Sequence, residues 1–324
     1  MHNPESGVSE ETDEANSAVR IVGGNVFVEL DPDHPGFQDE KYRERRNEIA
    51  KIAIEWNEMS MADRRTRKIP EAPYSDDEHG VWTAIMERME PMHQKYGCRQ
   101  YLKHAAQLDL PNDRIPQLQW VSEQLQPLTG FRQEPVGGLV HPKTFHTALA
   151  NKVFLSTQYI RHSSHPFYTP EPDVVHELVG HTAMLAVPEW AELNTLFGEA
   201  DMRTQSEAAI TRLGTVFWFV MEFGICRENG DIKAFGPGML SSFGEIEHAC
   251  SSGAACGREE ACVCDPQIEY RTPDFEEIET RPYDVTKYQP MLYLWNSFEE
   301  MFEKTSEFVK TWGTEADPRR ELHQ

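Results

Sequence analysis

Two histidines and one carboxylate in an apolar setting constrain this chain more than any other feature of its sequence. The segment T-P-E-P-D-V-V-H-E-L-V-G-H (residues 169–181) places His176 and His181 on either side of a glutamate, on the first turns of an expected helix. Further along, Glu222 lies in the run V-F-W-F-V-M-E-F-G (residues 216–224), where every other residue is apolar or glycine. A lone carboxylate there is costly unless a cation or hydrogen-bond donors satisfy it. Because two imidazoles and one carboxylate are the ligands of non-haem Fe(II) sites with open positions, we expect a metal centre.

The spacing of the histidines differs from that of zinc peptidases. Those enzymes use H-E-x-x-H, with the histidines four residues apart on one helical face. Here they are five apart, which on an ideal α-helix is about 140° of rotation. Both can reach one metal only if the helix is distorted or ends there, which Gly180 allows, and Asp173 after Pro172 is a suitable N-cap for its start. The alternative is that both are ordinary helix histidines and that Glu222 pairs with a buried arginine.

Charge and composition restrict the class of protein. With 31 Lys and Arg against 54 Asp and Glu, the 324-residue chain has a formal net charge of −23. Nucleic acid and anionic membranes both require a basic face, so we expect neither as a partner. No apolar run approaches the roughly 20 residues of a membrane span, and the acidic N-terminus lacks the basic and apolar regions of a signal peptide. We therefore expect a cytoplasmic protein.

The hydrophobic pattern predicts a mostly α-helical fold. Asp39 can cap a helix in which Tyr42, Ile49, Ile52 and Trp56 form one apolar stripe. Similar stripes predict three further helices, marked by Trp82, Ile85, Met86 and Met89, by Phe145, Ala148, Leu149, Val153 and Phe154, and by Trp190, Leu193, Leu196 and Phe197. The dipeptide Asn-Gly within residues 225–235 lies between alternating residues, which predicts a small antiparallel β-hairpin.

The longer segment T-Q-Y-I-R-H-S-S-H-P-F-Y-T-P-E-P-D-V-V-H-E-L-V-G-H (residues 157–181) resembles the signature of the pterin-dependent aromatic amino acid hydroxylases. Six more motifs follow in that family's order: D-P-D-H-P-G-F (31–37), Y-R-E-R-R (42–46), I-P-Q-L (115–118), F-W-F-V-M-E-F-G (217–224), F-G-P-G-M-L-S-S-F-G-E (235–245) and Y-Q-P (288–290). The resemblance covers roughly residues 26–312 and is greatest to the bacterial-type phenylalanine 4-hydroxylases. It implies a monooxygenase in which Fe(II) and a tetrahydropterin, such as tetrahydrobiopterin, reduce O2 to hydroxylate the ring of a free aromatic amino acid.

The resemblance also implies roles for individual residues. His176, His181 and Glu222 match the iron ligands. Arg161 matches the cation that binds the substrate α-carboxylate, and guanidinium suits this task because it forms two parallel hydrogen bonds. Asp173 would orient that arginine. At the polar end of the amino acid the resemblance implies contacts with Tyr168, Thr169 and Ser241. Around its ring it implies Pro172, Trp218, Phe223 and the first histidine.

The expected pterin site departs from the family in places. Phe145 matches the residue that stacks on the pterin ring, Glu177 the acid that reaches it through water, and Gly138, Leu139 and Val140 the stretch whose backbone reads its edge. His141 and Pro142 replace two serines common in the family, Phe217 replaces a common tyrosine, and Thr182 and Ala183 follow the second histidine in place of Val-Pro.

Two side chains indicate which amino acid is hydroxylated. Trp218 stands where phenylalanine and tyrosine hydroxylases have tryptophan, and Val285 matches the apolar residue of phenylalanine hydroxylases. Both favour L-phenylalanine as substrate and L-tyrosine as product, a step of phenylalanine catabolism. Meta-hydroxylation of phenylalanine, or hydroxylation of tyrosine or tryptophan, is the alternative.

The domain organisation follows from the same resemblance. We expect a disordered acidic tail at residues 1–20, a single catalytic domain at 21–312 and a disordered tail at 313–324. Animal members carry a regulatory domain and a tetramerisation helix for which this chain has no room, so we expect a monomer. Within the domain, residues 246–282 are an insertion that contains Cys250, Cys256, Cys262 and Cys264. Their spacings fit no standard zinc pattern, so a surface loop of reduced thiols is expected, with a structural zinc site or a redox-sensitive loop as alternatives.

Two functions from other classes are the remaining alternatives. A zinc metallopeptidase should have the H-E-x-x-H spacing, which the extra residue rules against. An inert metal-binding protein that kept the fold should have lost a metal ligand or the carboxylate-binding arginine, and the sequence retains all of them.

Overall fold

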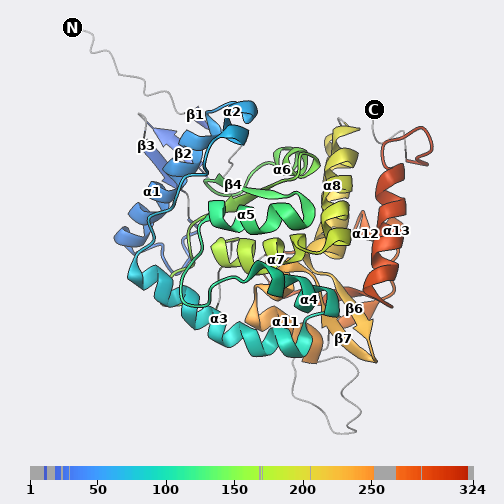
Figure 1. Ribbon diagram of the computed structural model, residues 1–324. Helices are drawn as coiled ribbons and strands as arrows, with labels where there is room; N and C mark the ends of the chain where they lie inside the picture. The colour runs from blue at the N-terminus through green and yellow to red at the C-terminus, as the bar shows by residue number, and fades with distance from the viewer. Residues whose placement is uncertain are drawn as a thin grey trace.

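Helices dominate the architecture, as expected (Figure 1). The computed structural model describes residues 30–167, 169, 171–204, 206–251, 268–285 and 287–319, and the backbone of 11–12, 19–22 and 25–28. The helices are α1 (Glu40–Asn57), α2 (Met61–Thr66), α3 (Asp76–Tyr96), α4 (Arg99–Leu108), α5 (Leu118–Thr129), α6 (Pro142–Ala150), α7 (Ala183–Leu185), α8 (Pro188–Met202), α9 (Glu207–Val216), α10 (Pro237–Leu240), α11 (Phe243–Ser251), α12 (Phe275–Ile278) and α13 (Phe298–Thr311), with two π-helices, η1 (His176–Thr182) and η2 (Phe217–Glu222).

Local sequence signals explain where several of these helices begin. Asp39 caps α1, since its side chain accepts a hydrogen bond of 3.1 Å from the backbone N–H of Tyr42, as predicted. Ser75 and Glu78 form a reciprocal capping box at the start of α3. The expected helices around Trp82 and Trp190 are α3 and α8, and both tryptophans are fully buried.

Strands occur in three small sheets. The strands are β1 (Glu11–Thr12), β2 (Val19–Val22) and β3 (Asn25–Val28) in an antiparallel sheet, β4 (Arg132–Val136) and β5 (Val153–Thr157) in a parallel pair, and β6 (Ile225–Glu228), β7 (Asp231–Ala234), β8 (Glu269–Arg271) and β9 (Met291–Trp295) in a sheet of order β7-β6-β9-β8. The predicted hairpin is confirmed as β6–β7, and its turn residues Asn229 and Gly230 have φ of 54° and 91°. The parallel pairs were not predicted.

The expected third helix was wrong in its second half. It ends at Ala150, and Lys152 has a φ of 56°, which takes the chain out of the helical path. Val153 and Phe154 then belong to strand β5, which is buried along its whole length beside β4. A short, continuously apolar run fits a buried strand and a buried helix equally well, so periodicity could not distinguish them.

The two expected tails are partly ordered. Glu11–Thr12 and Val19–Val22 pair with neighbouring strands, whereas the other residues of the N-terminal tail lie outside the described residues. At the other end, the expectation of a disordered tail was wrong for residues 313–319. Asp317 is buried and accepts hydrogen bonds from Gly313 and Arg319, and the guanidinium of Arg319 also pairs with Glu279.

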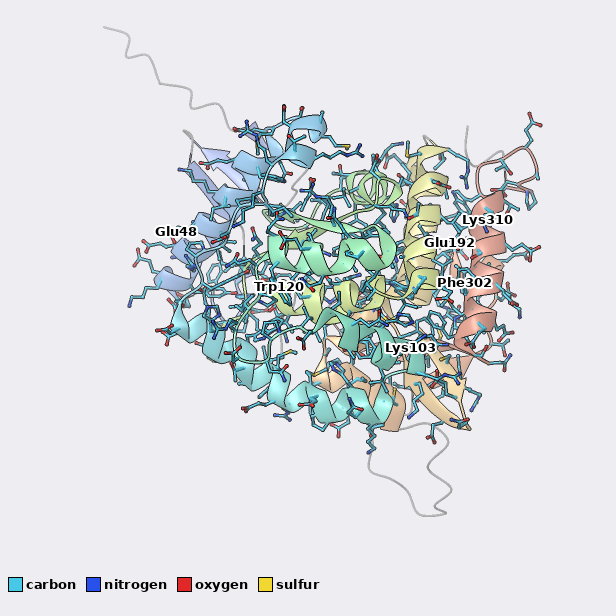
Figure 2. The ribbon with its side chains drawn as sticks, viewed as in Figure 1. Glu48, Lys103, Trp120, Glu192, Phe302 and Lys310 are labelled. Atoms are coloured by element: carbon cyan, nitrogen blue, oxygen red, sulfur yellow. The ribbon has the colours of Figure 1, made fainter. Side chains whose placement is uncertain are left out.

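Side chains fill the space between the helices, and charged groups such as Glu48 and Lys103 lie on the outside (Figure 2). Helices α8 and α13 lie side by side, with Glu192 and Lys310 in a 3.5 Å ion pair across them. In the described part of the chain, no helix combines the length and the apolar character needed to cross a membrane. The core continues to η1, η2 and α10, and α10, which contacts both π-helices, carries with them the site described next.

Candidate metal centre and its cavity

The distortion expected between the two histidines is a π-helix. Asp173 caps the entry to this segment, since its Oδ1 accepts a hydrogen bond of 3.1 Å from the backbone N–H of His176. From there η1 extends to Thr182. Because π-helical hydrogen bonds join residues five apart, a π turn is wider than an α turn and brings His176 and His181 toward one face. Glu222 ends the second π-helix, in which the N–H of Phe223 bonds to the carbonyl of Trp218 five residues earlier.

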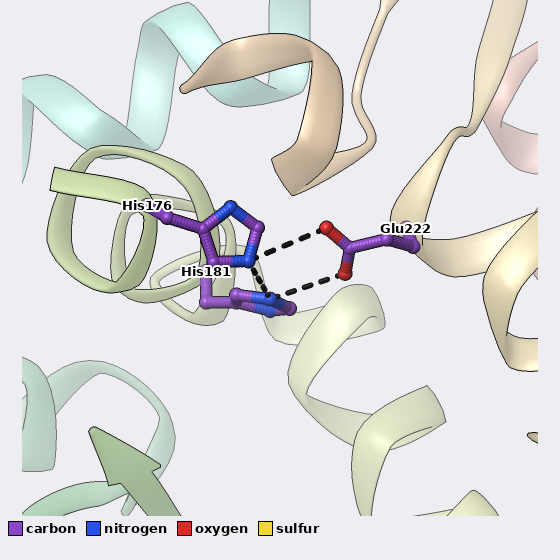
Figure 3. Close-up of side chains that lie close together, drawn as sticks. All are labelled: His176, His181 and Glu222. Carbon is purple, nitrogen blue, oxygen red and sulfur yellow. Dashed lines mark hydrogen bonds and ion pairs between the residues drawn. The ribbon is translucent and has the colours of Figure 1, made fainter. Parts of the chain in front are cut away.

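The three expected ligands converge (Figure 3). The Nε2 atoms of His176 and His181 are 3.0 Å apart, and they lie 3.4 Å and 3.1 Å from the two carboxylate oxygens of Glu222. One donor atom from each residue lies within 4.8 Å of the others, so all three can face one ion. Among the described residues, the ion-pair partners of Glu222 are these two histidines. The alternative interpretation required a buried arginine as its partner, and no ion pair of that kind is found among those residues.

At His176 and Glu222 the protonation suits metal binding. Burial lowers the pKa of His176 to about 4, so this imidazole is neutral. Burial would raise the pKa of Glu222, but the two histidines outweigh it and hold that pKa below its ordinary value. For His181, burial acts to lower the pKa and the attraction of Glu222 raises it above the ordinary value. An anionic carboxylate beside an imidazole with a free lone pair is the form in which such side chains bind a divalent cation.

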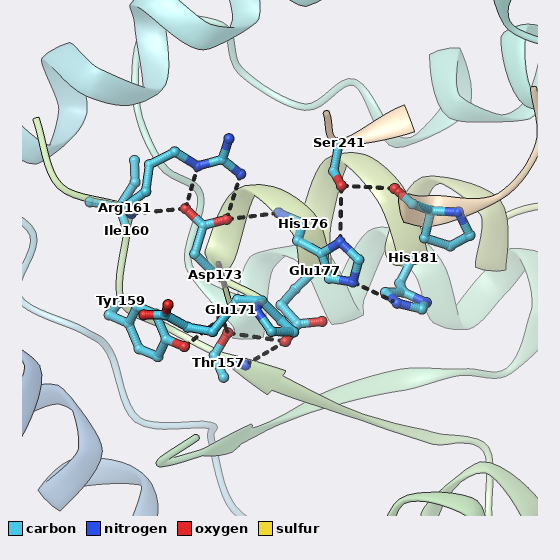
Figure 4. A network of polar contacts seen from close by, with 12 residues as sticks. Thr157, Tyr159, Ile160, Arg161, Glu171, Asp173, His176, Glu177, His181 and Ser241 are labelled. Carbon is cyan, nitrogen blue, oxygen red and sulfur yellow. Dashed lines mark hydrogen bonds and ion pairs between the residues drawn. The ribbon is translucent and has the colours of Figure 1, made fainter. Parts of the chain in front are cut away.

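Ser241 selects the tautomer of His176 (Figure 4). Its hydroxyl donates a hydrogen bond of 2.8 Å to the carbonyl of Pro237, so the serine oxygen accepts from His176 Nδ1 at 2.9 Å. Nδ1 therefore carries the proton, and Nε2 presents its lone pair to the metal position. The same helix, α10, packs against Gly180, where a Cβ would lie 2.9 Å from the carbonyl oxygen of Pro237.

Arg161 and Asp173 form a buried ion pair beside this cluster (Figure 4). Asp173 Oδ2 accepts from the backbone N–H and from Nε of Arg161, and Oδ1 accepts from Nη2, all at 2.8 Å. The two side chains are 3% and 0% exposed. Burial would raise the pKa of Asp173, but the charge and hydrogen bonds of Arg161 hold it below its ordinary value. The carboxylate thus fixes the direction of the guanidinium.

One cavity of about 490 Å³ joins these groups. Of the expected site residues it is lined by His176, His181, Glu222, Gly138, Leu139, Val140, Phe145, Glu177, Arg161, Thr169, Pro172, Trp218, Phe223, Ser241 and Val285. Asp173 does not line it but lies behind Arg161, and Tyr168 lies outside the described residues. The exposed apolar residues Leu139 and Val285 are 52% and 58% accessible, so the cavity opens to solvent on their side.

Aromatic rings form one wall of the cavity. The Trp218 ring is stacked on Tyr283, with centroids 4.5 Å apart and an interplanar angle of 16°, and it meets Phe223 at 4.6 Å. Its indole N–H donates to the side-chain oxygen of Gln289 at 3.3 Å. Sequence reasoning missed Tyr283, since an exposed aromatic outside any stripe carries no local signal.

The expected pterin residues lie together in the same cavity. Phe145 makes edge contacts with Phe154 and Phe217, with centroids 5.6 and 5.9 Å away. Glu177 accepts two hydrogen bonds from Thr157, from its backbone N–H at 3.2 Å and its hydroxyl at 3.0 Å. Burial raises the pKa of Glu177 to about 7, so this carboxyl can hold or release a proton near neutral pH. Further lining residues that sequence reasoning missed are His146, Phe154, Thr157, Phe167, Glu171, Gly214, Ser242, Glu245, Lys287 and Tyr288.

The cysteine insertion is only partly described. Cys250 is buried in α11 and its thiol is free, and Cys98 and Cys226 are buried free thiols as expected. Cys256, Cys262 and Cys264 lie outside the described residues, so the nature of the loop stays a prediction.

Comparisons with known proteins identify the family of this chain. Residues 10–317 match the family model of the biopterin-dependent aromatic amino acid hydroxylases. The chain is 39% identical over 295 residues to the tyrosine 3-monooxygenase of Schistosoma mansoni, covering 90% of this chain and 58% of that protein. It is 37% identical over 289 residues to the rat phenylalanine-4-hydroxylase, covering 88% of this chain and 59% of that protein. The chain thus spans less than two thirds of the length of these two relatives.

Solved structures share the fold. The phenylalanine hydroxylase of Colwellia psychrerythraea superimposes with a TM-score of 0.66 at 27% identity, covering 77% of this chain and 87% of that one. The Chromobacterium violaceum phenylalanine hydroxylase, in a structure with bound iron(III) and 7,8-dihydrobiopterin, has a TM-score of 0.64 at 24% identity and covers 73% and 82%. Since the family model covers nearly the whole chain, this protein belongs to the biopterin-dependent aromatic amino acid hydroxylase family.

Proposed function

We propose that this protein is an Fe(II)- and tetrahydropterin-dependent monooxygenase that converts free L-phenylalanine to L-tyrosine. The observation that carries the proposal is the position of the His176–His181–Glu222 cluster in the same cavity as Arg161. A metal with open positions and a cation for a carboxylate are the two groups that an amino acid hydroxylase must combine.

The donor set fits iron. Two imidazole nitrogens and one carboxylate occupy one face of a metal ion and leave the other positions open. His176, His181 and Glu222 would hold the ion, and Ser241 would keep the first imidazole in the binding tautomer. The chemistry supplied by bound Fe(II) and tetrahydropterin is the reduction of O2, with one oxygen atom transferred to the aromatic ring.

The amino acid would be held at both ends. Arg161 is fixed by Asp173 and would bind the α-carboxylate. The buried hydroxyl of Thr169 has no hydrogen-bond partner among the described residues, which supports a contact with the polar end of a ligand. The ring would lie against Trp218 and Phe223, whose tilted contact forms an apolar wall.

The pterin would lie on the Phe145 side of the cavity. Phe145 is held by edge contacts with Phe154 and Phe217, and Glu177 lines the same cavity as an acid that can exchange a proton near neutral pH. Leu139 is half exposed at this side of the opening. Tetrahydrobiopterin is the proposed cofactor, and Pro142 supplies no backbone donor to it.

The choice of phenylalanine rests on two positions. Trp218 and Val285 match the residues of phenylalanine hydroxylases, and Val285 lines the cavity. Overall similarity does not separate the substrates, because tyrosine and phenylalanine hydroxylases match at 39% and 37% identity. Tyrosine is therefore the second candidate substrate.

Product analysis tests the proposal. The protein is loaded with Fe(II) without oxygen, then given O2, L-phenylalanine and tetrahydrobiopterin, with each component left out in turn. Tyrosine formed only in the complete mixture supports the proposal. Meta-tyrosine, or hydroxylation of tyrosine or tryptophan alone, would keep the reaction class and replace the substrate or the position attacked. No hydroxylated product from any of the three amino acids would overturn it.

A control variant ties the product to the metal site. Glu222→Ala should bind no iron and form no product, whereas Asp317→Asn, which alters a buried ion pair at the C-terminal end, should form the same product.

That the protein is a monomer and is cytoplasmic stays a prediction. Light scattering after gel filtration measures the first.

A further inference from the structure

A second buried acid–imidazole pair lies in the cavity wall, away from the metal ligands. His146 of α6 lines the cavity, and its Nδ1 is 3.4 Å from Oδ1 of Asp201 in α8. The side chains are 3% and 0% exposed. Nδ1 and both oxygens of Asp201 have no hydrogen-bond partner of conventional geometry among the described residues. A fully buried carboxylate of this kind is costly unless a proton or a cation faces it.

The packing of α6 on α8 forces this pair together (Figure 1). A Cβ at Gly198 would collide with the carbonyl of His146 and the backbone nitrogen of Ala150, so the two helices touch at their backbones. The nearby cations are engaged elsewhere. Lys143 Nζ bonds to the carbonyl of Thr204, and the guanidinium of Arg203 bonds to carbonyls of α13 and its C-cap. His146 is therefore the group that faces the buried carboxylate.

The carboxylate that faces Nδ1 sets the tautomer of the His146 ring. A proton on Nδ1 is stabilised by Asp201, which leaves Nε2 of the neutral imidazole as a hydrogen-bond acceptor. Of the two ring nitrogens only Nδ1 is fully buried without a hydrogen-bond partner, and no side-chain hydrogen bond of His146 is found among the described residues. The ring packs beside both Phe145 and Phe217, with centroids 5.9 and 5.8 Å away, and those two rings are themselves 5.9 Å apart. His146 is therefore a polar group beside two aromatic rings of the cavity wall.

We propose that His146, oriented by Asp201, is a pterin-binding residue whose Nε2 accepts a hydrogen bond from an N–H group of the cofactor ring. The inference rests on the proposed function, because it requires a tetrahydropterin beside Phe145. The cofactor supplies donors of the right kind, since its reduced ring and its amino group carry several N–H bonds. Asp201 is a positioning residue that acts through the imidazole.

The test measures pterin binding without turnover. The probe is 7,8-dihydrobiopterin, titrated by calorimetry into the iron-free protein with no amino acid present. His146→Leu should weaken binding about 3- to 10-fold, the effect of one lost hydrogen bond. His146→Gln, which keeps an acceptor, should recover part of the affinity. Asp201→Asn should weaken binding less, and the double variant His146→Leu with Asp201→Asn should bind like His146→Leu alone.

Controls separate binding from folding. Leu149→Val changes a fully buried residue of α6 that does not line the cavity, and it should leave the dissociation constant unchanged. In steady-state assays, His146→Leu should raise KM for tetrahydrobiopterin and leave KM for phenylalanine unchanged. If a leucine here prevents folding, the Gln and Asn variants carry the test.

Two results would overturn the inference. Wild-type affinity in a folded His146→Leu protein would show that the imidazole does not bind the pterin. Losses that add in the double variant would show that Asp201 does not act through His146. Absence of dihydrobiopterin binding by the wild-type protein would instead overturn the proposed function, and the inference with it.

Discussion

Replacing Asp173 by asparagine tests how the cavity binds a carboxylate. In the native pair, one oxygen of Asp173 accepts from the backbone N–H and Nε of Arg161, and the other accepts from Nη2 and from the N–H of His176. Asparagine keeps one acceptor oxygen, but its amide nitrogen then faces two N–H donors. Two hydrogen bonds to a charged group are lost, each contributing about 1.5–3 kcal/mol. The total agrees with the roughly 3–5 kcal/mol found when a buried ion pair is broken.

Part of this loss should appear in substrate binding. A guanidinium that is no longer held in place must be ordered by the bound amino acid. We therefore expect substrate binding to lose about 2–3 kcal/mol, which lowers kcat/KM about 30- to 150-fold. The assay is steady-state turnover of L-phenylalanine with tetrahydrobiopterin, combined with urea unfolding. KM for phenylalanine should account for most of the change, and KM for the pterin should stay within about twofold.

The chain offers a matched control for this variant. Asp317 is also a buried aspartate that accepts from an arginine side chain and two backbone N–H groups, and it does not line the cavity. Asp317→Asn should cost comparable unfolding free energy and leave KM for phenylalanine unchanged. A folded Asp173→Asn protein with wild-type KM would refute the reasoning, because Arg161 would then bind no carboxylate or would need no support from Asp173.

Three further predictions follow from the site. Co(II) or Fe(II) at 100 times its dissociation constant should stabilise the wild-type protein by about 2.7 kcal/mol; His181→Ala should show no shift in thermal unfolding on metal addition. Gly180→Ala should lower the unfolding free energy by about 1–3 kcal/mol, because its Cβ would meet Pro237. Gly80→Ala in α3, where an added Cβ would meet no packed neighbour within 4 Å, should raise that free energy by about 0.5–1 kcal/mol. Burial raises the pKa of Glu245 from 4.5 to about 7, so the protonated form, which stabilises the fold, is lost as pH rises through 7. Relative to Glu245→Gln, the wild-type protein should lose on the order of 3 kcal/mol of unfolding free energy between pH 4.5 and 8. Unfolding free energies from urea that change with pH in parallel for the two proteins would contradict this prediction.

Much of the secondary structure could be predicted because its signals are local. Asp39 caps α1 through a contact three residues away, and the Asn229–Gly230 turn requires only the positive φ angles that these residues tolerate. The metal ligands could also be predicted from the sequence, because a glutamate in an apolar run and two nearby histidines can be recognised without a structure. Their five-residue spacing even indicated a distorted helix, although not which distortion.

The rest depends on contacts between distant segments. Helix α10 packs against Gly180 of η1, and the His146–Asp201 pair is brought together because Gly198 lets the backbones of α6 and α8 touch. Tyr283 reaches Trp218 from a segment 65 positions further along the chain, and neither residue signals the other. Caps, turns and stripes are encoded by neighbours in sequence, so residue order is enough to find them. A cavity is made by packing, and its geometry appears when the helices are in place.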